Sequence, residues 1–453
     1  MSNDLTRRKF LRNTAITAAV VPSAAQLLSS CATIQPPKYA TDKLRHAAIG
    51  VGGMGGADLN QISAHADVEI IALCDVDANN LAAAAKLHPK ARTYTDWREL
   101  LEQEHQGLDS VNVTTPDHMH APISYKAIAL GLHVYCQKPL THTVVEARRL
   151  KEIARRKGVV TQMGIQNHSA ANYSVAKKLF DQNLIKDIHE VHVWTDRPAG
   201  WWPQGVERPE GEDPIPETLD WDKWLGIAPV RPYKKGIYHA FAWRGRLDFG
   251  TGAQGDMGCH LMDPATWFLQ LTDPLTIKST GPAPTKDTFP LESHVEYQFP
   301  ATSKTAAGGV KVVWHDGKNK PEALLKKHGF ADKPYANGSL FIGSNGAHMF
   351  SPYEMPQTTF DDDQHPAVVL PPATPTNHWH QWVDACFGRA VASAPFDYAA
   401  HLTEVALLGN IALHFPNETL HWQGKRLRFE GNAAATALLS KDYRKGWRYS
   451  GLM

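Results

Sequence analysis

The chain has 453 residues, of which 43% are hydrophobic and 21% are charged, which predicts a globular protein long enough for two domains. Its formal net charge of +1 and the lack of a strongly basic region argue against a nucleic-acid partner. No run reaches the ~18–20 apolar residues that a membrane-spanning helix needs.

Residues 1–31 are typical of an export signal rather than of a folded domain. Arg7 and Arg8 form a twin-arginine pair followed by Phe-Leu, then a modest apolar stretch and a Leu-Ser-Ser-Cys box that ends at Cys31. This order resembles a twin-arginine signal joined to a lipoprotein cleavage site. We therefore expect an exported, periplasmic or outer-membrane lipoprotein that touches the membrane only through a lipid on Cys31, with residues 32–44 as a tether. The alternative is an ordinary basic, disordered tail.

A glycine-rich turn organises the part of the chain that follows. Gly50, Gly52 and Gly55 have the G-x-G-x-x-G spacing between an apolar run and a segment that can open a helix. Such glycines permit a tight turn, close approach of a pyrophosphate and packing of helix on strand. Asp75 ends the next apolar run, 25 positions after Gly50, where an acid can hold ribose hydroxyls. No Lys or Arg follows it closely, which favours NAD over NADP; an acid that merely ends a strand is the alternative.

Alternating strands and helices predict a parallel sheet with right-handed crossovers over residues 45–165, a Rossmann-type domain. Its later elements are expected as strands at 109–115, 133–136 and 159–164 and helices at 121–132 and 144–157.

Residues 166–453 predict a second α/β domain with an open, mostly antiparallel sheet. The strands are expected at 188–195, 293–299, 309–315, 339–343 and 346–350, with long loops at 197–235 and 352–376. Helices at 377–387 and 398–413 are expected to pack back on the first domain.

Two short stretches carry candidate chemistry. Asp256 and His260 follow a glycine-rich segment and stand four residues apart, on one face of a helix, where the carboxylate could fix the tautomer of the imidazole. Lys138 precedes Pro139, which stiffens the turn, and a lysine in a desolvated cleft can stabilise an alkoxide. Taken singly, Asp256 could be a helix cap, His260 a core histidine and Lys138 a surface charge.

Together with the TP-x-x-x-H stretch at 115–120, these motifs resemble the Gfo/Idh/MocA sugar oxidoreductases over about residues 45–450. The resemblance implies a Rossmann domain, an open-faced α/β domain, NAD(P) and a carbohydrate or polyol substrate. It places Lys138, Asp256 and His260 on the catalytic trio. It gives as cofactor contacts Gly50, Gly52, Gly53, Met54, Gly55, Asp75, Thr115, Pro116, Asp117, His120, Gln137, Lys138 and Asn167. The chain departs from the family at Gln137, where Glu is usual, so this contact loses a charge.

Loop aromatics suggest a sugar platform, with the pairs Trp201-Trp202, Tyr238-His239 and Trp243-Arg244 as the candidates. The substrate contacts we expect are His168, Tyr238, Trp243 and Arg244. Stability packing of each aromatic is an equal alternative. The spacing of His378 and His380 does not place both rings on one helical face, so no metal site is predicted. A homo-oligomer is expected because open sheet faces often pair.

Export bears on the reaction, because an exported enzyme has no obvious soluble pool of NAD. The cofactor should therefore stay bound and be regenerated in place. Redox-neutral glycoside hydrolysis through a 3-keto intermediate meets this requirement, and the resemblance includes such enzymes. The carbon 2 base is expected to be His168, Asp196 or Tyr238. A net sugar oxidoreductase and a non-catalytic carbohydrate-binding lipoprotein are the alternatives. Four cysteines are expected to stay free, namely Cys74, Cys136, Cys259 and Cys386.

Overall fold

The structure, a computed structural model, describes residues 43–330, 335–351, 354–362, 365 and 367–452. The predicted signal, Cys31 and nearly all of the predicted tether lie outside the described residues. Within the described part, no helix combines the length and apolar character needed to cross a bilayer. The four cysteines of this part are buried and none forms a disulfide, as predicted.

The N-terminal domain is a six-stranded parallel sheet with the strand order β3-β2-β1-β4-β5-β6. Its strands are β1 (Leu44–Ile49), β2 (Val68–Cys74), β3 (Arg92–Tyr94), β4 (Ser110–Val113), β5 (His133–Gln137) and β6 (Thr161–Gly164). Its helices are α1 (Met54–Ser63), α2 (Ala78–Leu87), α3 (Trp97–Glu104), α4 (Asp117–Ala129) and α5 (Val144–Lys157). The order reverses direction at β1 and β4, so a ligand crevice is expected beyond their carboxyl ends.

Local sequence signals explain why α5 begins and ends where predicted. Thr143 caps its first turn and Glu146 bonds back to the cap, which forms a capping box. Gly158 ends the helix in the left-handed conformation, with φ of 64°, and basic residues occupy the last turn.

The second domain holds a nine-stranded sheet in the order β13-β12-β11-β7-β10-β9-β8-β14-β15. Only the β7–β10 pair is parallel among these strands, so the mostly antiparallel character is confirmed. The strands are β7 (Glu190–Thr195), β8 (Thr276–Thr280), β9 (His294–Phe299), β10 (Val310–His315), β11 (Asn337–Ile342), β12 (Gly346–Ser351), β13 (Glu354–Phe360), β14 (Thr419–Gln423) and β15 (Arg428–Glu430).

One expectation for this sheet was wrong. Residues 354–360, placed in a proline-rich loop by the sequence, form β13 and pair with β12. The strand lies at the edge of the sheet, where Pro356 can occupy a position that needs no backbone N–H for the ladder.

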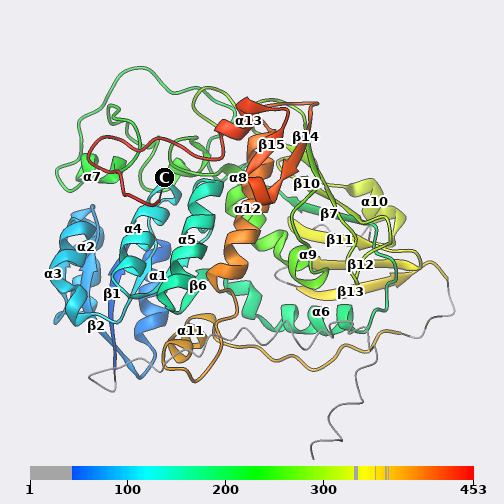
Figure 1. Ribbon diagram of the computed structural model, residues 1–453, viewed down its shortest axis with the longest axis horizontal. Helices are drawn as coiled ribbons and strands as arrows, with labels where there is room; N and C mark the ends of the chain where they lie inside the picture. The colour runs from blue at the N-terminus through cyan, green and yellow to red at the C-terminus, as the bar shows by residue number, and fades with distance from the viewer. Residues whose placement is uncertain (1–42, 331–334, 352–353, 363–364, 366, 453) are drawn as a thin grey trace, which may run out of the picture. The chain divides into compact units, whose positions relative to one another are not determined.

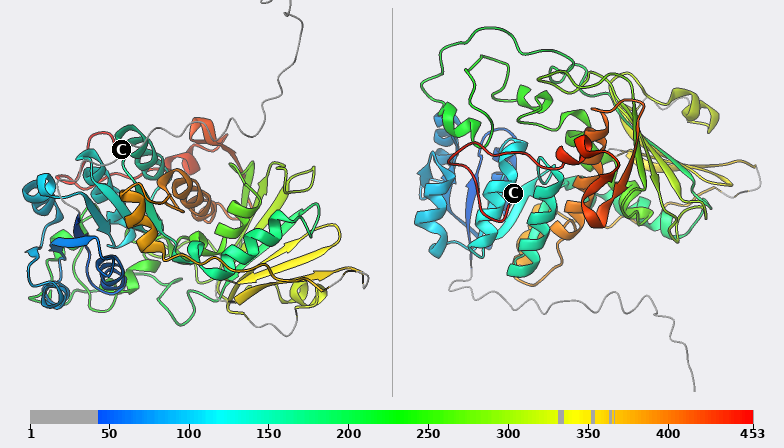
Figure 2. Two further views of the ribbon diagram at one scale, coloured as in Figure 1. Left: turned by 90° about the horizontal axis from the view of Figure 1, so that it is seen from below. Right: turned by 45° about the horizontal axis from the view of Figure 1, so that its top comes forward.

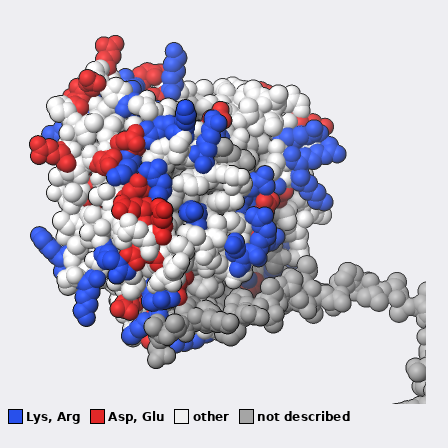
Figure 3. Space-filling view, turned by 60° about the vertical axis from the view of Figure 1, so that its left-hand side comes forward, with Lys and Arg blue, Asp and Glu red and all other residues white. Residues whose placement is uncertain are grey.

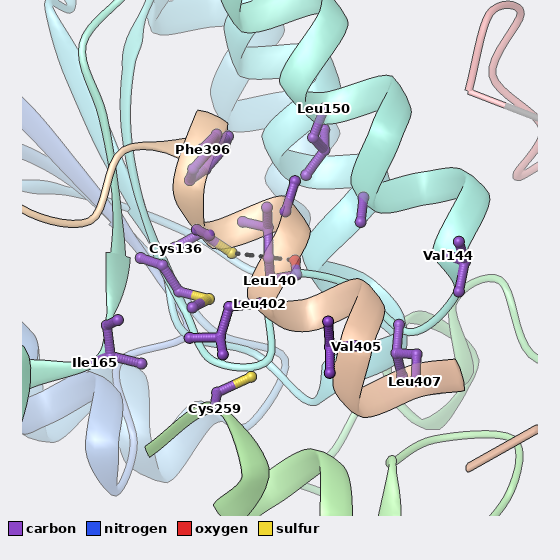
Figure 4. Packing of buried hydrophobic residues seen from close by; sticks show 14 of the residues in the cluster. Cys136, Leu140, Val144, Leu150, Ile165, Cys259, Phe396, Leu402, Val405 and Leu407 are labelled. Carbon is purple, nitrogen blue, oxygen red and sulfur yellow. Dashed lines mark hydrogen bonds between the residues drawn. The ribbon is translucent and has the colours of Figure 1, made fainter. Parts of the chain in front are cut away.

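Helix α12 (Phe396–Ala412) joins the two domains through a shared hydrophobic core (Figure 4). Its residues Leu402 and Val405 pack in one cluster with Cys136 and Leu140 of the first domain and Cys259 of the second. In Figure 1 the helix lies between α5 and the second sheet. The remaining helices are α6 (Ala171–Asp181), α7 (Trp221–Leu225), α8 (Gly252–Leu261), α9 (Asp263–Phe268), α10 (Glu322–Lys327), α11 (His378–Cys386), α12 (Phe396–Ala412) and α13 (Ala433–Ala437).

A long segment, residues 197–250, leaves the second sheet after β7 and runs back over the first domain (Figure 2). We call it the covering loop. It has an aromatic core of its own that includes Trp221, Trp224, Tyr238 and Phe249. Its backbone is bonded to the residues just after β2, because Thr218 O accepts from Ala78 N at 2.8 Å. This packing brings distant side chains to the crevice.

Candidate active site

A cavity of about 650 Å³ opens beyond the carboxyl ends of the first sheet. The glycine turn forms one end, Lys138 and α8 form the other, and the covering loop supplies the remaining wall. Most of the predicted site residues line this space, namely Gly50, Gly52, Gly53, Met54, Asp75, Thr115, Pro116, Asp117, His120, Gln137, Lys138, Trp243, Arg244, Asp256 and His260.

The glycine turn fits a dinucleotide. Helix α1 starts after Gly53 without a side-chain cap and without an acid in its first turn, so its free N–H groups can meet a phosphate. A Cβ on Gly50 would overlap the carbonyl oxygen of Thr114, and one on Gly55 would overlap the carbonyl oxygen of Gly50. Gly55 does not line the cavity and instead lets α1 pack closely. The glycine turn and the free N–H groups at the start of α1 would hold the pyrophosphate of NAD.

Asp75 braces the turn as well as facing the cavity. Its Oδ2 accepts hydrogen bonds from Val51 N at 2.9 Å and Gly52 N at 3.2 Å. Burial raises its pKa, although backbone donors counteract part of this shift. Lys223 of the covering loop also lines the cavity, but its Nζ pairs with Asp220 Oδ2 at 2.8 Å. The positive charge of Lys223 near the ribose end is thus paired with a carboxylate of the protein. It is not left unpaired for the 2′-phosphate of NADP, which agrees with NAD as the cofactor.

The charge that Gln137 lacks is present on a neighbouring side chain. Gln137 Nε2 donates to both carboxylate oxygens of Asp58, at 3.0 and 2.9 Å. Asp58 also accepts from Thr114 Oγ1 and from Trp379 Nε1, each at 2.8 Å. Burial raises the pKa of Asp58 to about 6. The sequence pointed to a lost charge, whereas the fold places a buried carboxylate directly behind Gln137.

His120 connects the two turns of the TP-x-x-x-H and K-P motifs. Its Nδ1 lies 2.7 Å from the carbonyl oxygen of Pro139 and its Nε2 lies 2.8 Å from that of Thr115. Carbonyl oxygens only accept, so both ring nitrogens must carry protons. Burial alone would lower the pKa of His120. Cys136 and the two carbonyl oxygens together raise it by more than burial lowers it, so the net shift is upward. Both contacts favour the doubly protonated ring, and through them His120 fixes the turn before α4 against the turn that carries Lys138.

Three cations converge on Asp256 at the reaction end. Lys138 Nζ lies 2.7 Å from Oδ1, and Arg197 Nη1 lies 2.9 Å from Oδ2. Arg244 Nε approaches Oδ1 at 3.3 Å. Burial raises the pKa of Asp256, but the charges of Lys138, Arg244 and Arg197 lower it more, and the result lies well below the usual range. Asp256 is therefore ionised and holds Lys138 in place.

His260 lines the same wall, one helical turn after Asp256. Its Nδ1 is buried and has no hydrogen-bond partner among the described residues, whereas both oxygens of Asp256 contact cations. The expectation that Asp256 orients this ring was wrong, because Asp256 is engaged by the cations. Burial, and then the charge of Lys138, lower the pKa of His260 to about 3. The ring is neutral at neutral pH, and the charge of Lys138 makes it a weak base unless that charge is offset.

Asp117 lines the cavity but is held by the second domain rather than left free for a cofactor. Thr251 Oγ1 donates to its Oδ2 at 2.7 Å. Burial raises the pKa of Asp117 to about 7, while Thr251 and the charge of Lys138 lower it in part.

Several expected contacts lie outside the cavity. Tyr238 is fully buried in the aromatic core of the covering loop, and His168 stacks on Trp267 and bonds to Asp263 Oδ2 at 2.8 Å. Asn167 does not line the cavity, but Gln166 does. Asp196 is exposed and not part of the lining. The structure therefore does not bring these residues to the cavity wall. Tyr238 and His168 pack into the core behind the crevice, as aromatic and imidazole side chains near a crevice can.

Sequence reasoning missed Arg197 and Phe241, which line the cavity, and named His239, which lines it too, only as part of a candidate sugar-platform pair. A weak signal existed for Arg197, since polar residues directly after a strand tend to reach a ligand site. Phe241 and His239 come from the covering loop, whose path the sequence does not reveal. Gly250, in the glycine-rich segment before Asp256, allows the close approach of Arg244, because a Cβ on it would overlap the Arg244 backbone.

Comparisons with known proteins agree with this geometry. Two sequence models of one family match, described as "Oxidoreductase family, NAD-binding Rossmann fold" over residues 44–165 and "Oxidoreductase family, C-terminal alpha/beta domain" over 174–337. An inositol 2-dehydrogenase from Salmonella paratyphi B is 26% identical over 152 residues, 33% of this chain and 45% of that protein. The chain thus spans less than half the length of this curated relative.

A second curated relative and a solved structure are also similar to this chain. A glycosyl hydrolase family 109 protein from Stenotrophomonas maltophilia is 35% identical over 129 residues, 26% of this chain and 28% of that protein. Among solved structures, the WlbA dehydrogenase from Chromobactrium violaceum, in complex with NADH and UDP-GlcNAcA, has a TM-score of 0.61 at 16% identity and covers 86% of this chain and 99% of its own. That similarity concerns the fold alone.

The two family models match the first domain and, in the second, residues 174–337 with strands β7 to β10, and the fold and the glycine turn agree with them, so the predicted resemblance and the NAD cofactor are confirmed. The chain belongs to the Gfo/Idh/MocA oxidoreductase family, with an NAD-binding Rossmann domain followed by the family's C-terminal α/β domain.

Proposed function

We propose that this chain is a carbohydrate-active enzyme that oxidises a sugar hydroxyl carbon with NAD that it keeps bound. We further propose that the net reaction is redox-neutral glycoside hydrolysis through a 3-keto intermediate. The observation that carries the proposal is one cavity with the NAD-binding glycine turn at one end and Lys138, Asp256 and His260 at the other. An exported, lipid-anchored location is part of the same proposal.

Retention of the nucleotide is supported by the covering loop. His239 of this loop has its Nε2 2.9 Å from Asp77 Oδ2, and Asp220 N donates to Val76 O at 3.0 Å. These contacts hold the loop against the residues that follow Asp75, beside the expected ribose position. With the loop held in this place, we expect exchange of the nucleotide between turnovers to be slow.

Each residue at the reaction end has a chemical role. Bound NAD would supply the hydride acceptor and later the hydride donor. His260 accepts the proton of the hydroxyl that is oxidised, because its neutral ring is available as a base. Lys138 stabilises the oxyanion, and Asp256 keeps its ammonium group in position at 2.7 Å. General acid–base help of this kind contributes about 10²–10⁴-fold.

Hydrolysis needs a second base. A ketone at carbon 3 makes the carbon 2 proton acidic. When a base removes this proton, the electron pair of the carbon 2–hydrogen bond forms a double bond between carbons 1 and 2, and the carbon 1 substituent leaves with the electron pair of its own bond to carbon 1. Water then adds to the alkene and the ketone is reduced, so the net change is addition of water across the glycosidic bond. Asp117 replaces His168, Asp196 and Tyr238 as our candidate base, because it lines the cavity and its pKa of about 7 suits proton transfer at neutral pH.

Two alternatives use the same site. A net sugar oxidoreductase is supported by the names of relatives such as inositol 2-dehydrogenase and levoglucosan dehydrogenase. Hydrolysis is supported by the glycosyl hydrolase family 109 relative and by the covering loop. A non-catalytic binding lipoprotein is disfavoured because Lys138, Asp256 and His260 converge in one cavity.

The test is incubation of the purified full chain with aryl glycosides and disaccharides without added NAD. Hydrolysis predicts many equivalents of released aglycone per protein and no accumulated oxidised sugar. Oxidised sugar that forms only when NAD is added, without aglycone release, would favour the oxidoreductase. Asp117→Asn should preserve reduction of the bound nucleotide by sugar but abolish aglycone release if Asp117 is the carbon 2 base.

A further inference from the structure

The reaction end of the cavity carries more positive charge than the protein neutralises there. Lys138, Arg197 and Arg244 all contact the single carboxylate of Asp256. The other acid on this wall, Asp117, is bound by Thr251 Oγ1 at 2.7 Å, and burial raises its pKa to about 7. The three cations therefore share a single ion-pair partner, the carboxylate of Asp256. On the outer face shown in Figure 3, by contrast, Lys and Arg are interspersed with Asp and Glu.

The two arginines are held in place while keeping donors available. Arg197 uses Nη1 for Asp256 and lies 4.0 Å from the ring of Trp201, and its buried Nε has no partner among the described residues. The Arg244 guanidinium lies 4.1 Å from the ring of Phe241 and 4.4 Å from that of Trp243. Each guanidinium has five N–H donors, so the pair can bind more than Asp256.

Burial makes this surplus costly. The side chains of Arg197 and Arg244 are only 18% and 19% exposed. Cations that are largely removed from water are stabilised when an anion enters and accepts their hydrogen bonds. The flat guanidinium groups match the two oxygens of a carboxylate better than a single hydroxyl.

We propose that the saccharide bound in this cavity carries an anionic group, the carboxylate of a uronic acid, which Arg197 and Arg244 hold. The inference rests on the proposed function, since that function makes the ligand a saccharide. The anion would also partly neutralise the charge around His260 and so make its ring a better base. A sulfate ester offers the same charge and acceptors, so the experiment must separate it from the carboxylate.

The pyrophosphate of the cofactor does not account for these arginines. Its binding residues are the glycine turn and the first turn of α1 in the first domain. Arg197 and Arg244 belong to the covering loop and share Asp256 with Lys138, which the proposed reaction uses at the sugar.

The first test measures binding by titration calorimetry on the full chain with its nucleotide. The probes are glucuronate, galacturonate, glucose 6-sulfate, glucose and galactose, each at low and high salt. We expect a uronate to bind about 10–100-fold more tightly than its neutral counterpart, with the advantage reduced by salt. Equal or undetectable binding of uronates and neutral sugars would overturn the inference. Tight binding of glucose 6-sulfate alone would contradict the assignment of the anionic group as a carboxylate.

Variants assign the effect to the arginines. Arg244→Gln and Arg197→Gln should each reduce the preference for uronate about tenfold or more, and Arg244→Lys should restore part of it. Arg149→Gln is the matched control, because Arg149 is exposed on α5 and pairs only with Glu152 among the described residues. Melting temperatures identify a variant that fails to fold. An unchanged uronate preference in folded Arg244→Gln and Arg197→Gln would refute the assignment.

Turnover separates this inference from the proposed function. Cleavage of neutral aryl glycosides without any uronate binding would leave the enzyme proposal standing and remove the anionic substrate. Uronate binding without any sugar oxidation or cleavage would support the anionic ligand and contradict the proposed enzymatic function.

Discussion

The two ends of the cavity are built in different ways. At the cofactor end, the glycine turn and the start of α1 come from about ten consecutive residues, and Asp75 follows on the next strand. At the reaction end, Lys138 follows β5, Arg197 follows β7, and Asp256 and His260 stand on α8. Backbone geometry shapes the first end, whereas long-range ion pairs shape the second.

This difference predicts how each end of the cavity responds to a substitution. A substitution at the cofactor end should alter the backbone and nucleotide binding together. A substitution at the reaction end should alter chemistry or charge balance while the nucleotide stays bound. Four experiments test this division, from the largest expected effect to the smallest.

His260→Ala should lower sugar turnover about 10²–10⁴-fold, because the proposed proton acceptor is removed. Nucleotide content, measured by absorbance after denaturation, should stay the same. His421→Ala serves as the control, since His421 is exposed on β14. Full activity in His260→Ala would defeat the assignment of His260.

Asp256→Asn should lower the free energy of unfolding at neutral pH by about 3–5 kcal/mol, because three cations lose their shared carboxylate. The pKa of Asp256 is depressed in the folded state, so its contribution is present above the unfolded value of about 3.9 and is lost as the pH falls through the lower folded value. The gap to the native protein should therefore narrow on acidification. Denaturant titrations at neutral and acidic pH measure it, with exposed Asp442→Asn as the control. A gap that widens in acid would contradict the ion-pair account.

Gly50→Ala should lower the free energy of unfolding by about 1–3 kcal/mol and release nucleotide, because the new Cβ meets the Thr114 carbonyl. Gly131→Ala is the matched control. Both glycines have positive φ, 80° and 88°, but Gly131 has no atom within 4 Å of the added Cβ. The difference between the two variants isolates the close contact from backbone strain. Equal stability and equal nucleotide content would show that the turn tolerates the methyl group.

His120→Asn should lower the free energy of unfolding by about 1 kcal/mol in mildly acidic solution, because at least one bond to Thr115 or Pro139 is lost. The pKa of His120 is raised in the folded state. Its charged form therefore stabilises the fold fully below the unfolded value of about 6.5, and the contribution is lost as the pH rises through the folded value. Melting temperatures across this range should show the gap to the native protein closing as the pH rises. A gap independent of pH would mean that the ring is neutral.

Much of the fold was predictable because it depends on local signals. Helix α5 has a capping box, an apolar stripe and a terminal glycine, and its predicted bounds coincide with the observed ones. The short strands β3, β14 and β15 went unpredicted, since three to five residues with little apolar pattern carry a weak signal. Strand β13 was missed because its proline reads as a loop until the edge position is known.

The candidate site divides in the same way. Lys138, Asp256 and His260 could be named from motif spacing, and the fold brings them into one cavity. Lys223 could not, because it reaches the cavity through the path of the covering loop, and Arg197 had only the weak signal of its place just after β7. Tyr238 and His168 were misplaced, since an aromatic next to a ligand and one in the core behind it have the same local sequence.

The sequence by itself determined the Rossmann turn, the alternation of strands and helices around it and the three residues of the proposed reaction. Those features follow from glycine spacing, apolar periodicity and motif order, which are local along the chain. Only the tertiary structure decided which charges surround Asp256, that Asp58 lies behind Gln137, and that His120 binds two carbonyls at once. Such contacts depend on distances between segments up to hundreds of residues apart, and these distances are fixed only when the domains share one core.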